Sequence, residues 1–157
     1  MGDASSKRKS EGGEGVLVSQ ILKGKGDLVF TAGPGETVGA VAALLHSRKV
    51  GAMIVMEGES VAGIVSERDI VRMVAEEGAG ALGKPVSICM TRDVVFASPD
   101  ETVDSLLTRM TDRRIRHLPV LRDGRLAGIV SIGDLVKHKI NEVEAEADGL
   151  KAYIAAG

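Results

Sequence analysis

The sequence contains a long internal repeat. Residues 36–71 align with residues 101–136 at a constant offset of 65 positions and without a gap. Twelve of the 36 aligned pairs are identical, and the longest identical run, Ala-Gly-Ile-Val-Ser, occupies 62–66 and 127–131. A repeat of this length is a supersecondary unit rather than a helical turn. One such unit is too small to bury its own sheet, so the chain must fold as two similar units that pack together.

Each unit is predicted to contain a strand, a helix, two strands and a helix. The predicted strands are residues 29–31, 52–56 and 61–66 in the first unit and 95–97, 117–121 and 126–131 in the second. The predicted helices begin with Pro34 and near Glu67, and with Pro99 and near Gly133. A glycine between the last two strands of each unit favours a hairpin. This order predicts an α/β (α+β) fold of two pseudo-symmetric repeats, each a small three-stranded sheet with two helices, packed sheet to sheet.

The composition excludes several functional classes. The formal net charge is −2 and the pI near 5.9, which argues against nucleic-acid binding, and aromatic residues are only 2% of the chain. The single cysteine, Cys89, can form no intrachain disulfide and no structural zinc site by itself. No uncharged stretch is longer than eleven residues, so we expect no membrane span and a cytoplasmic protein.

The chain divides into four segments. Residues 1–15 contain no Ile, Leu, Val or aromatic residue and are predicted to be a disordered tail. Its Met-Gly start matches the myristoylation pattern, but the acidic Asp3 favours a plain soluble tail. We assign 16–79 to the first repeat, 80–141 to the second, and 142–157 to a C-terminal helix or tail.

The glycine-rich segment 78–84 matches two phosphate-binding patterns. It satisfies both G-x-G-x-x-G and G-x-x-x-x-G-K. Both mechanisms need a strand before the glycines and a helix after them. Here the glycines follow a predicted helix, and Pro85 stands where a P-loop needs a hydroxyl group. We therefore interpret 78–84 as a linker between the repeats.

Two Ser-x-x-Asp pairs stand where a strand meets a helix, Ser66 with Asp69 and Ser131 with Asp134. The spacing is typical of a capping box, in which the serine and the carboxylate satisfy free amides. The same carboxylates could also accept hydrogen bonds from the hydroxyl groups of a ribose. A carboxylate has lone pairs for both tasks, so the two interpretations are compatible.

The two repeats differ at one informative position. The second repeat has Arg116 and His117 where the first has Gly51 and Ala52. Such a pair at a strand start is often a solvated edge, yet arginine also suits bidentate binding of phosphate. The two units therefore cannot offer the same environment to a phosphate group.

The chain resembles the tandem cystathionine β-synthase (CBS) domain pair, often called a Bateman module. The residues that carry the resemblance are the two Gly-Ile-Val-Ser-x-x-Asp segments, 63–69 and 128–134, with Arg116–Val120, Pro99–Val103 and Cys89–Thr91. The resemblance covers about residues 17–141, which leaves too little chain for a catalytic domain. It therefore implies a stand-alone, non-catalytic regulatory module.

The resemblance also implies a ligand and a site. Modules of this family bind adenine nucleotides between the repeats, so the expected ligands are AMP, ADP, ATP, NAD(H) or S-adenosylmethionine, with no metal ion. With few basic side chains, AMP or NAD(H) is favoured over a triphosphate. Implied ribose-binding residues are Asp69, Asp134, Ser66 and Ser131; implied phosphate-binding residues are Arg116, His117 and Arg68. The expected adenine pocket comprises Val29, Phe30, Thr31, Val95, Phe96, Ala97, Gly51, Ala52 and Pro119.

We therefore expect an energy or redox sensor that is read by an unknown downstream protein. The resemblance implies a homodimer built on helical faces, with exposed positions at Val71, Val74, Leu135 and Val136 and an acidic helix at 140–154. The alternative is a structural or interaction homodimer with no physiological ligand. An enzyme that uses a nicotinamide cofactor through segment 78–84 is a third, weaker hypothesis.

Overall fold

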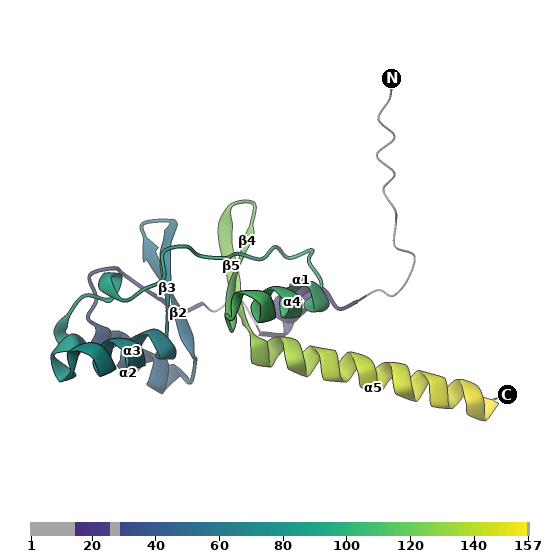
Figure 1. The fold of residues 1–157 in the computed structure, drawn as a ribbon. Helices are drawn as coiled ribbons and strands as arrows, with labels where there is room; N and C mark the ends of the chain where they lie inside the picture. Colours follow the sequence, from purple (N-terminus) through teal and green to yellow (C-terminus); the bar gives the residue numbers. More distant parts are fainter. Residues whose placement is uncertain (1–14, 26–28, 157) are drawn as a thin grey trace, which may run out of the picture.

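The structure is a computed structural model that describes residues 15–25 and 29–156. Two lobes lie side by side, and the β2–β3 hairpin of one faces the β4–β5 hairpin of the other (Figure 1). The elements, in chain order, are α1 (Val18–Lys25), β1 (Thr31–Ala32), α2 (Val38–Arg48), β2 (Ala52–Glu57), β3 (Ser60–Ser66), α3 (Glu67–Glu77), η1 (Ala79–Gly83), η2 (Val86–Ile88), α4 (Val103–Arg113), β4 (His117–Arg122), β5 (Arg125–Ser131) and α5 (Ile132–Ala156). The predicted α+β architecture of two repeats is confirmed.

The two sheets repeat one register. In the first lobe β1 runs parallel to β2, and β2 runs antiparallel to β3. In the second lobe β4 and β5 pair in the same antiparallel register, with a bulge at the equivalent place. Its third strand is reduced to one parallel bridge, between Ala97 and Val120. That bridge lies 65 positions after the pair of Ala32 with Val55 in the first lobe.

The first helix of each unit begins later than the prolines suggest. Pro34 and Pro99 lie in turns, and α2 and α4 begin at Val38 and Val103. The reason is the threonine before each helix, Thr37 or Thr102, whose hydroxyl group accepts a hydrogen bond from an amide of the first helical turn. A side chain that satisfies a free amide fixes a helix start more firmly than a proline that merely tolerates one.

The two hydrophobic cores each take in a segment from outside their own repeat. The linker segments η1 and η2 pack into the first core through Ala81 and Val86. Helix α1 packs into the second core through Val18, Ile21 and Leu22, although it lies within the 16–79 range assigned to the first repeat. The segment before each repeat therefore completes the core of the other repeat, which ties the lobes together.

Each repeat has one glycine at the place where the segment from outside it packs against its sheet, Gly63 in the first and Gly128 in the second. A Cβ atom on Gly63 would lie 2.7 Å from Met90 Sδ and 2.8 Å from the Thr91 carbonyl oxygen. A Cβ atom on Gly128 would lie 2.6 Å from a methyl group of Leu22. Met90 and Leu22 thus occupy corresponding places, each against the sheet of one lobe.

Gly63→Ala is expected to destabilise the protein by about 1–3 kcal/mol. The added methyl group meets the Thr91 carbonyl oxygen, which belongs to the backbone bridge with Ile64 and cannot move freely. Urea denaturation measures the change in the free energy of unfolding. Gly80→Ala is the matched control, because nothing lies within 4 Å of its new Cβ atom, and we expect a change within about 0.5 kcal/mol. Equal losses for both variants would contradict the contact.

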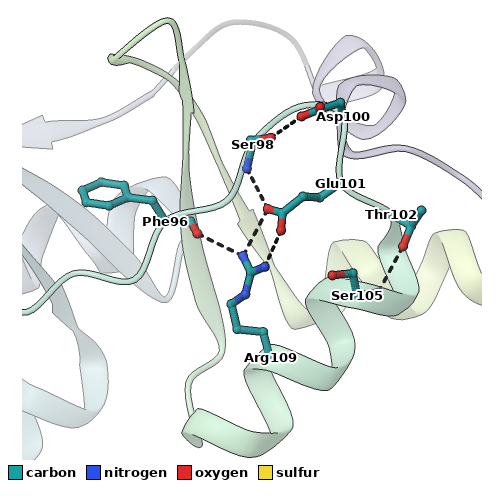
Figure 2. A network of polar contacts seen from close by, with 7 residues as sticks. All are labelled: Phe96, Ser98, Asp100, Glu101, Thr102, Ser105 and Arg109. Carbon is teal, nitrogen blue, oxygen red and sulfur yellow. Dashed lines mark hydrogen bonds and ion pairs between the residues drawn. The ribbon is translucent and has the colours of Figure 1, made fainter. Parts of the chain in front are cut away.

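A polar network holds the segment that leads from the second sheet into α4 (Figure 2). Arg109 forms an ion pair with Glu101 and donates a hydrogen bond of 3.0 Å to the Phe96 carbonyl oxygen. Glu101 also accepts from the Ser98 amide at 2.8 Å, and the arginine lowers its pKa. The first lobe has Leu44 at the position of Arg109. The first lobe repeats only the amide contact, from Gly33 to Glu36, so the arginine adds its hold on the residues just after Val95 to the second lobe.

Candidate functional site

A cavity of about 350 Å³ lies between the two lobes. Its walls come from the start of β2, the β3–α3 junction, the segment 91–95 and the start of β4. Nine of the predicted site residues line it: Gly51, Ala52, Ser66, Arg68, Asp69, Val95, Arg116, His117 and Pro119. The structure thus brings the Ser-x-x-Asp pair of the first repeat together with the Arg-His pair of the second.

The other predicted site residues lie outside this cavity: Val29, Phe30, Thr31, Phe96, Ala97, Ser131 and Asp134. Phe30 packs against the first core and stacks under the Arg48 guanidinium group, 4.7 Å from the ring centre. Ala97 is buried in the second core. Neither phenylalanine lines the cavity, and its larger apolar lining residues are Ile64, Val94, Val95, Ile115 and Pro119.

Asp69 is the one charged residue that is buried among those the structure describes, with 8% of its surface exposed. Its Oδ2 atom accepts from the Ser66 amide at 2.9 Å, and the Asp69 amide donates to the Ser66 hydroxyl group at 3.3 Å. The capping box is therefore present. The other oxygen, Oδ1, accepts a hydrogen bond of 3.0 Å from the guanidinium group of Arg72, whose side chain is 57% exposed. In this position Oδ2 can continue to cap the helix, while Oδ1 can release Arg72 and accept a hydrogen bond from a hydroxyl group of a ligand.

Asp134 occupies the corresponding place in the second repeat but has a different partner. Lys25 Nζ lies 2.6 Å from Asp134 Oδ2 and donates to the Ile129 carbonyl oxygen at 3.0 Å. Burial alone would raise the pKa of Asp134, but the Lys25 ammonium group and the Ser131 amide outweigh it and lower that pKa. The second carboxylate is thus already paired within the chain.

This difference arises in the two segments that pack against the opposite repeat, α1 and the linker that contains η1 and η2. Lys25 follows Leu22 by three residues, as Asp93 follows Met90 by three, and Leu22 and Met90 occupy corresponding places. Asp93 lines the same cavity as Asp69, whereas Lys25 forms an ion pair with Asp134. Both carboxylates are therefore paired within the chain, Asp69 with Arg72 through Oδ1 and Asp134 with Lys25 through Oδ2.

Lys25→Met is expected to lower stability at neutral pH by up to about 1 kcal/mol, because the ion pair is partly exposed. Asp134 has a lowered pKa in the folded state, so its contribution is present above the unfolded pKa and is lost as the pH falls through the folded one. The difference between variant and wild type should therefore shrink toward pH 2–3. Urea denaturation at several pH values measures it. Lys23→Met, on the same helix, is the control, and a pH-independent difference would count against the pair.

Four arginines gather around the cavity: Arg68, Arg72, Arg114 and Arg116. Arg68 and Arg116 were predicted from the sequence, whereas Arg72 and Arg114 were not. Arg72 could have been found from its i, i+3 spacing to Asp69 on a helix. Arg114 could not, because its direction depends on a left-handed conformation after α4, with φ 55°. The lining also contains three carboxylates, Glu67, Asp69 and Asp93, so four positive and three negative side chains leave a net charge of +1.

His117 packs across the lobes against Gly51. A Cβ atom at position 51 would lie 3.0 Å from His117 Nε2, so the small residue of the first repeat makes room for the imidazole of the second. Burial lowers the pKa of His117, and the positive charge of Lys25 lowers it further. At pH 7 the imidazole is therefore neutral, and of the Arg-His pair only Arg116 brings a charge to the cavity.

The glycine-rich segment 78–84 does not form a phosphate loop. It follows helix α3 rather than a strand, Gly78 ends that helix, and η1 packs its Ala81 into the first core. Among residues 15–25 and 29–156 no group of three His, Cys, Asp or Glu side chains could hold a metal ion. Within the same residues, no helix is long and apolar enough to cross a membrane. Cys89 is buried, and burial raises the pKa of its thiol.

Comparison with known proteins identifies the family. The CBS domain profile matches residues 26–76 and 86–141. The chain belongs to the CBS domain family. A curated relative, the mitochondrial CBS domain-containing protein CBSX3 of Arabidopsis thaliana, is 31% identical over 97% of this chain and 78% of its own length. These matches confirm the tandem pair expected from the repeat, and CBS pairs are in general regulatory rather than catalytic modules.

Solved structures agree with the fold. A CBS-domain containing protein from Agrobacterium tumefaciens superposes with a TM-score of 0.77 at 45% identity, over 79% of this chain and 99% of that one. A CBS domain protein from Pyrobaculum aerophilum in complex with AMP gives 0.67 at 25% identity, over 76% and 89%. A CBS domain pair in complex with 5′-methylthioadenosine and S-adenosyl-L-methionine gives 0.72 at 25% identity, over 82% and 98%. Two CBS domain proteins of this fold thus bind adenine nucleosides or nucleotides.

Proposed function

We propose that this protein is a non-catalytic regulatory module that binds an adenine nucleotide, AMP or NAD(H) rather than S-adenosylmethionine, in the cavity between its lobes. The observation that carries the proposal is the placement of the buried Asp69 carboxylate and the Arg116 guanidinium group, from different repeats, on one cavity. Asp69 would hold the ribose hydroxyl groups beside Ser66. Arg116, with Arg68, would hold phosphate.

The charge of the cavity separates the expected ligands. S-adenosylmethionine carries a positive sulfonium centre, which the four arginines would repel, whereas a phosphate group would be attracted. The volume of about 350 Å³ lies near the lower end of the range for small-molecule pockets, roughly 300–1,000 Å³. It therefore suits a mononucleotide, and NAD(H) would have to extend through the open side. No metal ion is part of the proposal.

Asp134 and Ser131 would form a second, weaker ribose site. Asp134 does not line the cavity of about 350 Å³ and is paired with Lys25 through Oδ2, so a nucleotide there would have to make room for itself beside that lysine. The two sites would then fill at different concentrations. A nucleotide bound in the first site stabilises one arrangement of the lobes, and a downstream protein would read that arrangement as an energy or redox signal.

A thermal shift series with AMP, ADP, ATP, NAD(H) and S-adenosylmethionine tests the proposal. At a hundredfold excess over its Kd, a ligand stabilises the folded state by about 2.7 kcal/mol. For a chain of this length that raises Tm by about 5–10 °C. AMP or NAD(H) should give the largest shift, and S-adenosylmethionine the smallest. No shift with any of the five would favour the alternative, a structural or interaction homodimer without a ligand.

We also propose that the module is a cytoplasmic homodimer. Support comes from exposed apolar residues on helices of both repeats, Val71 on α3 and Val136 on α5, which are 67% and 42% exposed. Leu135 does not belong to this surface, because it is fully buried in the second core. The single free cysteine suits a reducing compartment. Light scattering at tens of micromolar tests the dimer, and cell fractionation tests the location.

A further inference from the structure

Helix α5 carries an exposed apolar stripe with coiled-coil spacing. Its residues alternate at intervals of four and three, and we call them the seam: Val136, Ile140, Val143, Ala147, Leu150 and Ile154. This is the a/d pattern of a heptad repeat, with Ile140, Ala147 and Ile154 at a positions. From Ile140 to Ile154 the large seam residues are between 51% and 68% exposed.

No other described part of the chain covers this seam. The stripe of α5 that faces the second lobe contains Leu135, Lys139 and Glu142, about 100° around the helix from the seam. Beyond that stripe α5 extends away from both lobes (Figure 1). Its outer part also contains Gly149, which weakens a helix by about 1 kcal/mol relative to alanine. A helix of this kind gains most of its stability from packing, so the seam needs a partner helix.

We propose that the seam pairs with the seam of a second copy of this chain to form a parallel, in-register, two-stranded coiled coil. Isoleucine at a positions and leucine at a d position, as at Ile140, Ile154 and Leu150, favour two parallel strands. The small Ala147 at the central a position lets the two helices approach closely. The outer part of α5 extends away from both lobes, and its seam residues are more than half exposed, so they are accessible to a second helix.

The charges beside the seam select this orientation. In a parallel pair, Glu146 of one chain lies beside Lys151 of the other, and Lys139 beside Glu144, which is attractive in both cases. In the antiparallel arrangement that overlaps the whole seam, Glu144 meets Glu144 and Glu146 meets Glu146, which is repulsive. Lys139 is already held 3.0 Å from Asp104 of its own chain, so the Glu146–Lys151 pair carries most of the selection.

This inference rests on the proposed homodimer and is independent of the nucleotide site. It specifies the surface and the orientation that hold the dimer. Val143→Glu with Leu150→Glu should raise the dimer dissociation constant about 100-fold or more, because four carboxylates would be buried along one seam. Ala145→Glu with Ala152→Glu is the matched control, which adds the same charge to the opposite face of the same helix. Sedimentation of the full-length chain distinguishes a 16.4 kDa monomer from a dimer of twice that mass.

Cysteine cross-linking tests the orientation. In a parallel pair the two residues at position 147 face each other across the seam, within the Cα separation that a disulfide accepts. Ala147→Cys should therefore form a disulfide-linked dimer when oxidised glutathione is the oxidant. Ala145→Cys, on the outer face, should not. The native Cys89 is buried, and a Cys89→Ser background removes its contribution.

The outcomes are distinct. Three results together support the proposal: the Val143/Leu150 variant dissociates, the control variant stays dimeric, and Ala147→Cys chains cross-link. A dimeric Val143/Leu150 variant overturns the seam but leaves the homodimer, since another face then holds it. Cross-linking between Ala147→Cys and Val143→Cys chains, without cross-linking of Ala147→Cys to itself, overturns the parallel orientation. A monomeric wild type at tens of micromolar overturns both the seam and the proposed homodimer.

Discussion

Replacing Arg116 by alanine is expected to weaken AMP binding by a factor of about 10 to 150 and to leave adenosine binding nearly unchanged. A hydrogen bond to a charged phosphate contributes about 1.5–3 kcal/mol, and Arg116 lines the cavity from the second repeat where the first repeat has only Gly51. Calorimetry with adenosine, AMP and NAD on the wild type and on Arg116→Ala measures the effect at pH 7.5.

Arg122→Ala is the matched control for Arg116, because Arg122 lies exposed at the other end of the same strand, β4, and does not line the cavity. Its AMP affinity should equal that of the wild type. If Arg116→Ala lost the same factor for adenosine, AMP and NAD, the side chain would support the fold rather than hold phosphate.

His117 adds a pH dependence to the same experiment. Burial and Lys25 lower its pKa, so the imidazole is neutral at pH 7 and above. His117→Gln should therefore leave AMP affinity unchanged between pH 7 and 8. As the pH falls through this lowered pKa, the wild type should gain affinity over the variant, because protonation then adds a positive charge beside the phosphate. A difference between the two proteins that stays constant while His117 becomes protonated would show that charge is not involved.

The sequence was sufficient to predict the repeat, the hairpins and the second helices. These features depend on local spacing, since alternating apolar residues and a glycine turn define a hairpin wherever it lies. The starts of α2 and α4 were misplaced because Pro34 and Pro99 compete with the threonine caps three residues later. Both signals are local, but only the threonines satisfy an amide.

The site was harder to predict than the fold. The contacts between the lobes depend on which residues of segments 16–25 and 79–95 reach the opposite repeat. The spacing of apolar residues in the sequence does not predict those contacts. The symmetric expectation for Asp69 and Asp134 therefore missed Lys25, a residue outside the aligned region that reaches Asp134 alone. Neither Phe30 nor Phe96 lines the cavity that contains Asp69 and Arg116, so their assignment to an adenine slot stays a prediction. An identical motif in two repeats does not give two identical sites.

Asp69→Asn is expected to weaken AMP and adenosine binding alike, by a factor of about 10 to 150. The amide keeps an acceptor for the Ser66 backbone but loses the charge that strengthens hydrogen bonds from ribose hydroxyl groups. The effect should therefore differ from that of Arg116→Ala, which acts on the phosphate alone. Calorimetry on each variant measures binding, and urea denaturation measures the free energy of unfolding.

Two variants separate the roles of Asp69. Ser66→Ala removes the hydroxyl group of the capping box and keeps the carboxylate, so it should cost about 1 kcal/mol of stability while most of the binding remains. Asp134→Asn makes the same chemical change in the repeat where Lys25 occupies the carboxylate, and should leave the tighter binding event unaltered. If Asp69→Asn lost stability but bound AMP as the wild type does, the carboxylate would be a helix cap and nothing more. If Asp134→Asn weakened the tighter event as much as Asp69→Asn, the assignment of that event to the Asp69 carboxylate would be wrong.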